Sequence, residues 1–388
     1  MSKSMVLYKL FFICVAVLTV LAGGCNENNQ AYQDSIENTI EDRTAEIVSQ
    51  ERIIHFPDED SLGTIKIDKY DPNFLWPTQE KGSSKGDVTI KAGYMVGLQI
   101  PKDTVTDLSI LKSLKPYDLQ NLTLYGAKLE DNDLVNLVPL TGLQSLNLTS
   151  TPVTDKGMIY IRELVNLKFI MLTDTAVGDE GLSYLAGLKS LRGLLLTQTK
   201  ITDQGMKYIG GLTQMEEMRL SYTSITDAGV REIKGLKKLQ RFSLRTTKIT
   251  DKSMPYLEGF KELRGLRLGQ TGITDKALAS VAKLKKLQSL NLYDTKITDA
   301  GLAHLKDMQS LEELIISKTQ ITDAGIRHIS GLKNLKTLSL NTTSISDAVL
   351  DYFKDMPSLK RVYLKETNVT RQGVAELKKV KPKCHCVL

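Results

Sequence analysis

The chain has 388 residues, of which 41% are hydrophobic and 6% aromatic, which is ample for the core of a globular protein or a solenoid. Two of its four cysteines, Cys14 and Cys25, lie within the first 25 residues, so the rest of the chain has no disulfide framework. The net charge of +6 divides into +2 for residues 1–25 and −8 for residues 26–60, which leaves +12 for residues 61–388. Such a basic domain attracts an acidic partner or an anionic envelope, although lysines at a solvated edge give the same excess.

Residues 1–25 are typical of a signal peptide with a lipobox. Lys3 and Lys9 precede an apolar run, residues 10–22, that is too short to span a bilayer. Residues 21–25, LAGGC, resemble the lipobox of bacterial lipoproteins, in which Cys25 is lipidated and becomes the mature N-terminus. We therefore expect an exported protein, lipid-anchored to the membrane of the bacterial cell envelope. Plain secretion, or release into the periplasm, with cleavage near Gly24 is the alternative.

The next two segments do not repeat. Residues 26–60 carry ten Asp or Glu against two Arg, and we expect them to form a solvated acidic tether. In residues 61–94, the stretches 63–67 and 87–90 alternate as strands do, between turn-rich segments. Because the first unit of a stacked array has to be covered, we expect residues 61–94 to form a small N-terminal β-cap.

A 24-residue pattern fills residues 95–382 in about twelve units, ten of them regular from Leu143 onward. The first regular unit reads L-x-x-L-x-L-x-x-T-x-V-T-D-x-G-M-x-x-I-x-x-L-x-x. Positions 4 and 6 share one face of a strand, position 11 returns to the core, and positions 16, 19 and 22 have helical spacing. Stacked units complete one another's core. The pattern predicts an α/β repeat solenoid, with a curved parallel sheet on the concave side and short helices on the convex side.

Two polar positions recur in the repeat. Position 9 is threonine in all ten regular units, and we expect its hydroxyl to bind backbone groups in a ladder between units; a threonine-lined binding strip is the alternative. Position 13 is aspartate in nine of them, just before the apolar helical stripe, which predicts a helix N-cap. A row of calcium ligands is the alternative, but calcium needs several oxygens converging on one point.

The chain ends KCHCVL, residues 383–388, which we expect to cap the last unit. Oxidation of Cys384 and Cys386, or metal binding together with His385, are the alternatives, although zinc sites normally need more ligands. No Ser-His-Asp set, phosphate-binding glycine loop or His-Glu-x-x-His helix is visible in the sequence. We therefore expect no enzyme activity, no catalytic residue, no metal and no cofactor.

Positions 3, 5, 7 and 8 of each unit point away from the core and vary from unit to unit. Early units carry apolar side chains there, and middle units carry arginine and tyrosine, which are typical of interface hot spots and of carboxylate or phosphate recognition. An ordinary solvated surface is the alternative. With strands about 4.8 Å apart, the inner arc is on the order of 50 Å and suits a large ligand. The candidate ligand-binding residues are Phe169, Met171, Leu195, Arg219, Tyr222, Arg241, Arg245, Arg267 and Tyr293.

The units at residues 287–310 (LQSLNLYDTKITDAGLAHLKDMQS) and 335–358 resemble leucine-rich repeats of the ribonuclease-inhibitor and F-box type. From about residue 95 onward the chain is most similar to exported, largely uncharacterised bacterial proteins with such repeats, including many from planctomycetes. The resemblance implies a leucine-rich repeat fold and names no ligand, because this fold serves many functions. F-box relatives use their repeats to select substrates for ubiquitin ligases.

Three functions follow as hypotheses. The first is a recognition module on the bacterial cell envelope, whose concave face binds a protein or an anionic polysaccharide, with no nucleic acid expected. The second is a structural or adhesive spacer. The third is an F-box-like effector that supplies the substrate-recognition part of a ubiquitin ligase. Against the third stand the export signal and the lack of an F-box-like helical module before the repeats.

Overall fold

The computed structural model describes residues 43–58, 61–71, 77–104 and 107–388. The predicted lipidation site Cys25 and residues 26–42 of the predicted tether lie outside these residues. The chain divides into two compact units, Met1–Ser49 and Gln50–Leu388. In the described part of the first unit, residues 43–48 are helical, and the strands all belong to the second unit. No helix within the described ranges is long and apolar enough to cross a membrane.

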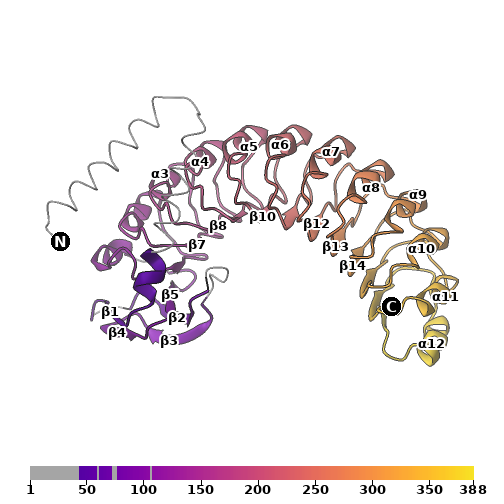
Figure 1. Ribbon diagram of the computed structural model, residues 1–388, viewed down its shortest axis with the longest axis horizontal. Coiled ribbons are helices and arrows are strands. Elements are labelled where there is room, and N and C mark those ends of the chain that lie inside the picture. Colours follow the sequence, from indigo (N-terminus) through magenta and orange to yellow (C-terminus); the bar gives the residue numbers. More distant parts are fainter. Residues whose placement is uncertain (1–42, 59–60, 72–76, 105–106) are drawn as a thin grey trace. The chain divides into compact units, whose positions relative to one another are not determined.

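The second unit is organised around a curved 15-stranded sheet (Figure 1). From β5 to β17 consecutive strands are parallel neighbours, and each pair is offset by one 24-residue unit, as Met218 opposite Phe242 shows. Beyond β5 the sheet continues through β2 to the edge strand β3. The strands are β1 (Arg52–His55), β2 (Thr64–Lys69), β3 (Gln79–Ser83), β4 (Asp87–Ile90), β5 (Tyr94–Gln99), β6 (Asn121–Thr123), β7 (Ser145–Asn147), β8 (Phe169–Met171), β9 (Gly193–Leu195), β10 (Glu217–Arg219), β11 (Arg241–Ser243), β12 (Gly265–Arg267), β13 (Ser289–Asn291), β14 (Glu313–Ile315), β15 (Thr337–Ser339), β16 (Arg361–Tyr363) and β17 (His385–Val387).

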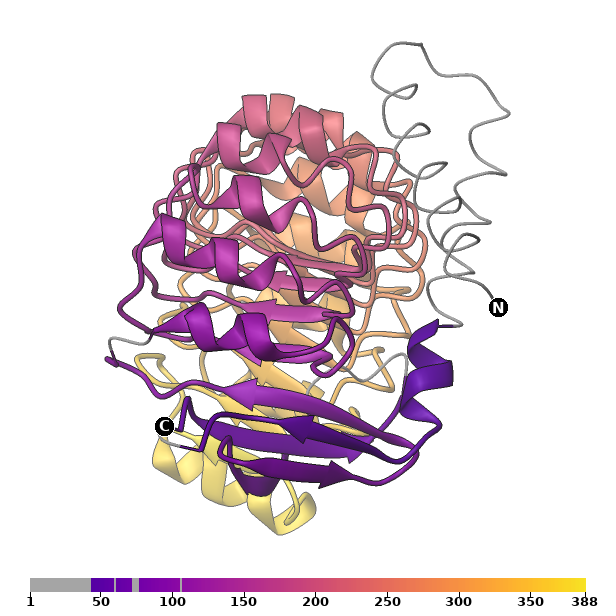
Figure 2. The same ribbon diagram turned by 90° about the vertical axis from the view of Figure 1, so that its left-hand side faces the viewer.

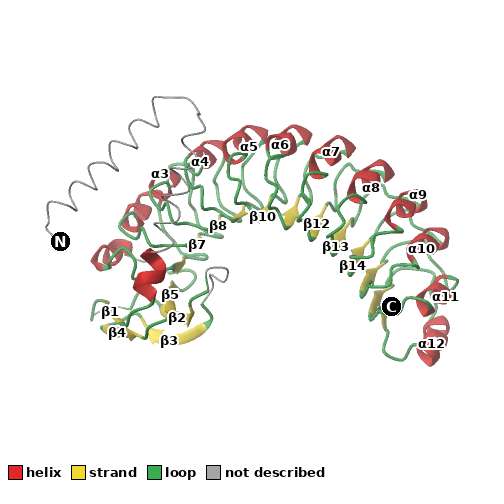
Figure 3. Ribbon diagram, in the orientation of Figure 1, coloured by secondary structure: helices red, strands yellow, loops and turns green. Residues whose placement is uncertain are grey.

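Short helices cover the convex side of this sheet, while the strands line the concave side (Figure 3). The predicted α/β solenoid is therefore confirmed. The α-helices are α3 (Met158–Ile161), α4 (Asp179–Ser183), α5 (Asp203–Ile209), α6 (Asp227–Glu232), α7 (Met254–Leu257), α8 (Asp275–Val281), α9 (Asp299–Leu302), α10 (Asp323–Ile329), α11 (Val349–Lys354) and α12 (Arg371–Val380). The 3-10 helices are η1 (Leu108–Ser113), η2 (Asp131–Leu137), η3 (Asp251–Ser253) and η4 (Ala303–Leu305).

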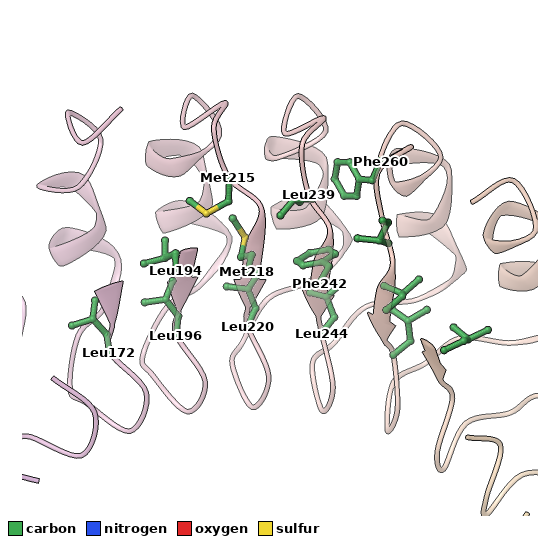
Figure 4. Close-up of a cluster of buried hydrophobic side chains, with 14 of the residues drawn as sticks. Leu172, Leu194, Leu196, Met215, Met218, Leu220, Leu239, Phe242, Leu244 and Phe260 are labelled. Atoms are coloured by element: carbon green, nitrogen blue, oxygen red, sulfur yellow. The ribbon is translucent and has the colours of Figure 1, made fainter. Parts of the chain in front are cut away.

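One continuous apolar core runs between the strands and the helices. Side chains in or next to the strands, such as Met218, Leu220 and Phe242, belong to it (Figure 4). Phe242 also meets Phe260 edge-to-face, with ring centroids 6.0 Å apart. The repeat positions assigned to the core are buried in the structure, which leaves the intervening strand residues on the concave surface.

The N-terminal region differs from its predicted boundary at residue 60. Strand β1 lies within the segment expected to be a tether, yet it pairs antiparallel with β4, Ile54 opposite Val88 (Figure 2). Ile54 and Phe56 are 0% and 5% exposed, so apolar residues alternate here as in a strand. The acidic composition of the whole segment had pointed to a tether instead. Strand β2 instead joins the main sheet, antiparallel to β5. The antiparallel region therefore draws on residues before position 61.

At the other end, residues 385–387 add strand β17 to the sheet, parallel to β16. Cys384 is only 1% exposed and packs into the core beside the last unit. Both Cys384 and Cys386 are free thiols. The final residues thus extend the ladder of strands by one more member.

Candidate functional site

The recurrent aspartates bind the following unit. The carboxylate of Asp275 accepts hydrogen bonds from the backbone N–H of Thr298 at 2.8 Å and from its hydroxyl at 2.6 Å, 23 residues along the chain. In most units the helix cap is the residue before the aspartate, as in α5, where the Thr202 hydroxyl accepts from the N–H of Gln204. In α3 and α11 it is Gly157 and Ala348, which follow the aspartate. The prediction of aspartate N-caps was therefore wrong. The same pair of hydrogen bonds to the next unit is accepted by Asp131, Asp179, Asp203, Asp227, Asp251, Asp299, Asp323 and Asp347.

The repeat leaves space for this contact between units. A Cβ atom placed on Gly301 would lie 2.3 Å from Oδ1 of Asp275, so glycine is what allows this close approach in that unit, while Ser253 at the same position donates its hydroxyl to Asp227. The aspartates are spaced one per unit and occupied by backbone and hydroxyl donors. Within the described residues no group of three or more His, Cys, Asp or Glu could hold a metal ion.

The recurrent threonines serve their own unit. The Thr247 hydroxyl donates to the carbonyl of Leu244 at 2.7 Å, and all ten position-9 threonines make the same bond three residues back. The expected hydrogen bond from the hydroxyl to a backbone group is confirmed, but the ladder between units is wrong, because each bond closes the turn after its own strand. Most of these threonines are buried, so they offer no strip to a ligand.

The apolar candidates lie side by side on β8 and β9. Phe169 and Met171 are half-buried, whereas Leu195, expected to be exposed, keeps only 9% of its surface. The Phe169 ring lies over Gly193, where an added Cβ would be 2.1 Å from the ring. The structure thus leaves Phe169 and Met171 as the accessible apolar part of the candidate surface.

Two of the candidate arginines are held by one carboxylate, Glu217 at the start of β10. Arg219 Nη2 and Arg241 Nε donate to Glu217 at 2.6 and 2.8 Å. The Glu217 side chain is 9% exposed, against 46% and 64% for the two arginines. Burial raises the pKa of Glu217, but hydrogen bonds and positive charge from Arg241 and Arg219 outweigh it and bring the pKa below its usual value. The carboxylate is therefore ionised at neutral pH and orients both guanidinium groups.

A third arginine lies between two aromatic rings. The Arg245 guanidinium is 5.6 Å from the ring centroid of Tyr222 and 5.5 Å from that of Tyr293. Its Nε and Nη2 both donate to Oε1 of Gln270, at 3.1 and 2.9 Å. Tyr293 lies two units beyond Arg245 at the same repeat position, where the intervening unit has Gly269. The missing side chain lets arginine and tyrosine meet across a strand.

Arg267 is the fourth arginine of this patch, and it is exposed. Its side chain makes no hydrogen bond or ion pair with any other described residue. It lines a hollow of about 130 Å³ together with Glu217 and Arg241, and a larger one of about 320 Å³. We call the larger hollow the basic groove. The described residues that line it are Thr173, Thr197, Arg219, Ser221, Tyr222, Ser243, Arg245, Arg267 and Asn291, with no acidic residue among them.

The structure therefore joins six of the nine candidates, Arg219, Tyr222, Arg241, Arg245, Arg267 and Tyr293, in one arginine-tyrosine patch. Sequence reasoning missed the residues that order it. Glu217 could have been found, because it precedes Arg219 by two residues and Arg241 by one unit, and both offsets make neighbours in a stacked sheet. Gln270 gave less signal, since its position is polar in most units.

Comparison with known proteins finds leucine-rich repeats over the strands that carry this site. A family model described as "Leucine-rich repeat region" matches residues 154–384, and one described as "Leucine Rich repeat" matches residues 141–161. No curated protein matches the chain. Among solved structures, an internalin (inlF) from Listeria monocytogenes has 23% sequence identity and a TM-score of 0.58, covering 76% of this chain and 86% of that chain.

Two further structures are more distant in shape. An internalin C2 (inlC2) from Listeria monocytogenes is 29% identical over 54% of this chain and 84% of that chain, with a TM-score of 0.43. A leucine-rich repeat protein from Leptospira interrogans is 19% identical over 74% of this chain and 93% of that chain, with a TM-score of 0.47. Because the longer family match spans more than half of the 388 residues, the chain belongs to the leucine-rich repeat family, whose modules are generally non-catalytic scaffolds for protein binding.

Proposed function

We propose that this chain is a non-enzymatic recognition protein of the bacterial cell envelope, which binds another protein on its concave face. The observation that carries the proposal is the arrangement of the arginine-tyrosine patch, in which Glu217 and Gln270 fix three arginines on an accessible surface. Long side chains lose conformational entropy on binding, and side chains that are already ordered lose less of it. Arginine and tyrosine are also the residues most enriched in interface hot spots.

The size of the surface supports a macromolecular partner. Strands β8 to β13 carry the candidate residues, and five strand spacings of about 4.8 Å make this region about 24 Å wide. That is the scale of the central part of a standard protein–protein interface. A spacer function alone does not require arginines that are ordered by a buried carboxylate on an accessible surface.

The envelope anchor is a separate part of the proposal. It rests on the apolar run of residues 10–22 followed by the lipobox-like residues 21–25, with Cys25 as the lipidated residue. Labelling of cells with a palmitate analogue is expected to mark the wild-type chain and to miss the Cys25→Ser variant. Equal labelling of both would remove the anchor and leave secretion. The repeat subtype, ribonuclease-inhibitor and F-box-like, is likewise proposed from the pattern of the units alone.

Charge reversal on the concave face tests the recognition role. Arg241→Glu with Arg245→Glu is expected to reduce capture of the partner from envelope extract by about 100-fold or more, because contacts to charged groups contribute about 1.5–3 kcal/mol each. Capture on the immobilised full chain is quantified by mass spectrometry. The matched control is Lys306→Glu with Arg327→Glu, which reverses two exposed charges outside the concave strands, the second on α10.

The control is expected to capture the partner as the wild type does, and both variants should keep the wild-type circular dichroism spectrum. If the concave variant captures the same proteins at the same level, the recognition role is wrong and the spacer function is favoured.

A further inference from the structure

At repeat position 5, the charged part of the concave face is confined to two strands. Strand residues at repeat position 5 follow one another across the sheet, and arginine occurs there only in β10 and β12 among strands β8 to β14. On both sides of these two strands the position is neutral or apolar. The residues from β8 to β14 are Met171, Leu195, Arg219, Ser243, Arg267, Asn291 and Ile315.

The basic groove lies across these strands and has one guanidinium without a partner. Arg219 and Arg245, which also line it, are already bound to Glu217 and Gln270. Arg267 lines the same hollow, and its guanidinium makes no hydrogen bond or ion pair within the part of the chain that the structure describes. With Glu217 counted, the four arginines of the patch carry a net charge of +3, and Arg267 is the one whose guanidinium has neither a carboxylate nor an amide partner among the described residues.

The contacts of Glu217 show that a carboxylate fits between the arginines of this patch. Glu217 Oε1 lies 2.6 Å from Arg219 Nη2 and Oε2 lies 2.8 Å from Arg241 Nε. These are the distances of strong charge-assisted hydrogen bonds between guanidinium and carboxylate. A second carboxylate, brought by a ligand, would find in Arg267 the same donor fork without an internal competitor.

We propose that the basic groove binds an extended acidic segment of a partner polypeptide, in which a carboxylate pairs with Arg267 and the flanking residues are neutral or apolar. This inference rests on the function proposed above and specifies its ligand. The flanking surface matches such a segment, since the hydroxyls of Thr173 and Thr197 and the half-buried Met171 lie on one side of the arginines. A regular polyanionic polysaccharide would instead need an unbroken row of cations, and Ser243 and Asn291 interrupt the arginines of repeat position 5.

Fluorescence anisotropy with the full chain tests the proposal. The probe is a fluorescein-labelled ten-residue peptide with a central Glu-Asp pair flanked by Leu, Thr and Ala, and its control replaces the pair by Gln-Asn. Binding of the acidic peptide is expected, with about a tenfold loss or more both for the amide peptide and for Arg267→Met. The matched control, Arg361→Met, removes an exposed concave arginine on β16 and should change binding by less than about twofold.

The proposal is overturned if Arg267→Met binds the acidic peptide as tightly as the wild type, or if no peptide binds up to about 1 mM. Tighter binding of an oligogalacturonate than of the peptide would overturn it in favour of a polysaccharide ligand. Partner capture separates this inference from the recognition role. Loss of capture on reversal of Arg241 and Arg245, but not in Arg267→Met, would remove only the assignment of the acidic segment. Unchanged capture in both variants would remove both.

Discussion

The loops and the concave surface of each unit are built in opposite ways. In the loops, the same aspartate and threonine bonds recur from unit to unit, and they are satisfied within the chain. On the concave surface, the cluster of Glu217 with Arg219 and Arg241 occurs once, between two particular strands. What recurs holds the stack together and has no capacity left for a ligand. What occurs once is not required by the repeat, and we propose that it determines what the protein binds.

Removal of one aspartate should give the largest effect on stability and none on binding. Asp275→Ala deletes two hydrogen bonds to Thr298, and we expect about 3 kcal/mol of lost local stability because bonds to charged groups contribute about 1.5–3 kcal/mol each. Hydrogen exchange of the Thr298 amide should accelerate by about 100-fold. Asp307→Ala, which removes an exposed aspartate with no side-chain hydrogen bond described, is the control. Equal exchange in both variants would contradict the role assigned to the aspartates.

A smaller effect is expected from the threonine position. Thr247→Val preserves shape but removes the hydrogen bond to the Leu244 carbonyl, so we expect a loss of about 1 kcal/mol in urea unfolding. Thr337→Val is the control, because the Thr337 side chain lies on β15, is 8% exposed and makes no hydrogen bond within the described residues. Loss of partner capture in Thr247→Val without loss of stability would show instead that the recurrent residues take part in recognition.

The pH dependence of Glu217 gives the smallest expected effect and probes the concave side alone. Since the folded pKa of Glu217 is lowered, its stabilising contacts with the two arginines are complete above the usual pKa of about 4.3 and are lost as the pH falls through the lower, folded pKa. Carbon-13 NMR of the carboxyl group should show a titration midpoint below that value. In Arg241→Met the midpoint should rise, because burial remains while one cation is gone. A midpoint that ignores this substitution would mean that Arg241 does not hold the carboxylate.

The sequence predicts the fold well and the contacts between units poorly. Leucines at positions 4 and 6 and the helical stripe define one unit completely, because periodicity reports which face of an element is buried. The partner of Asp275 lies 23 residues away. The local sequence alone does not show whether the carboxylate binds the helix of its own unit or a residue of the next unit. Strand β1 was missed for a related reason, since its pairing with β4 joins residues that are distant along the chain.

The candidate site was found in part for the same physical reason. Exposed strand positions can be read from the repeat, so Arg219, Arg241, Arg245 and Arg267 could be assigned to one surface. The sequence did not show which of these arginines are hydrogen-bonded within the chain, because pairing depends on rotamers and on neighbours such as Gln270 and Gly269.

The direction of the aspartate contacts has a consequence for how such a chain can change in length. Most 24-residue modules carry both halves of the contact, a hydroxyl that binds the preceding module and a carboxylate that binds the following one. Deletion or duplication of such a module therefore restores the same contact, whereas a change by any other number of residues separates the carboxylate from its donor. Growth of the chain by entire modules would shift the position of the arginine-tyrosine patch along the arc while leaving its own geometry intact.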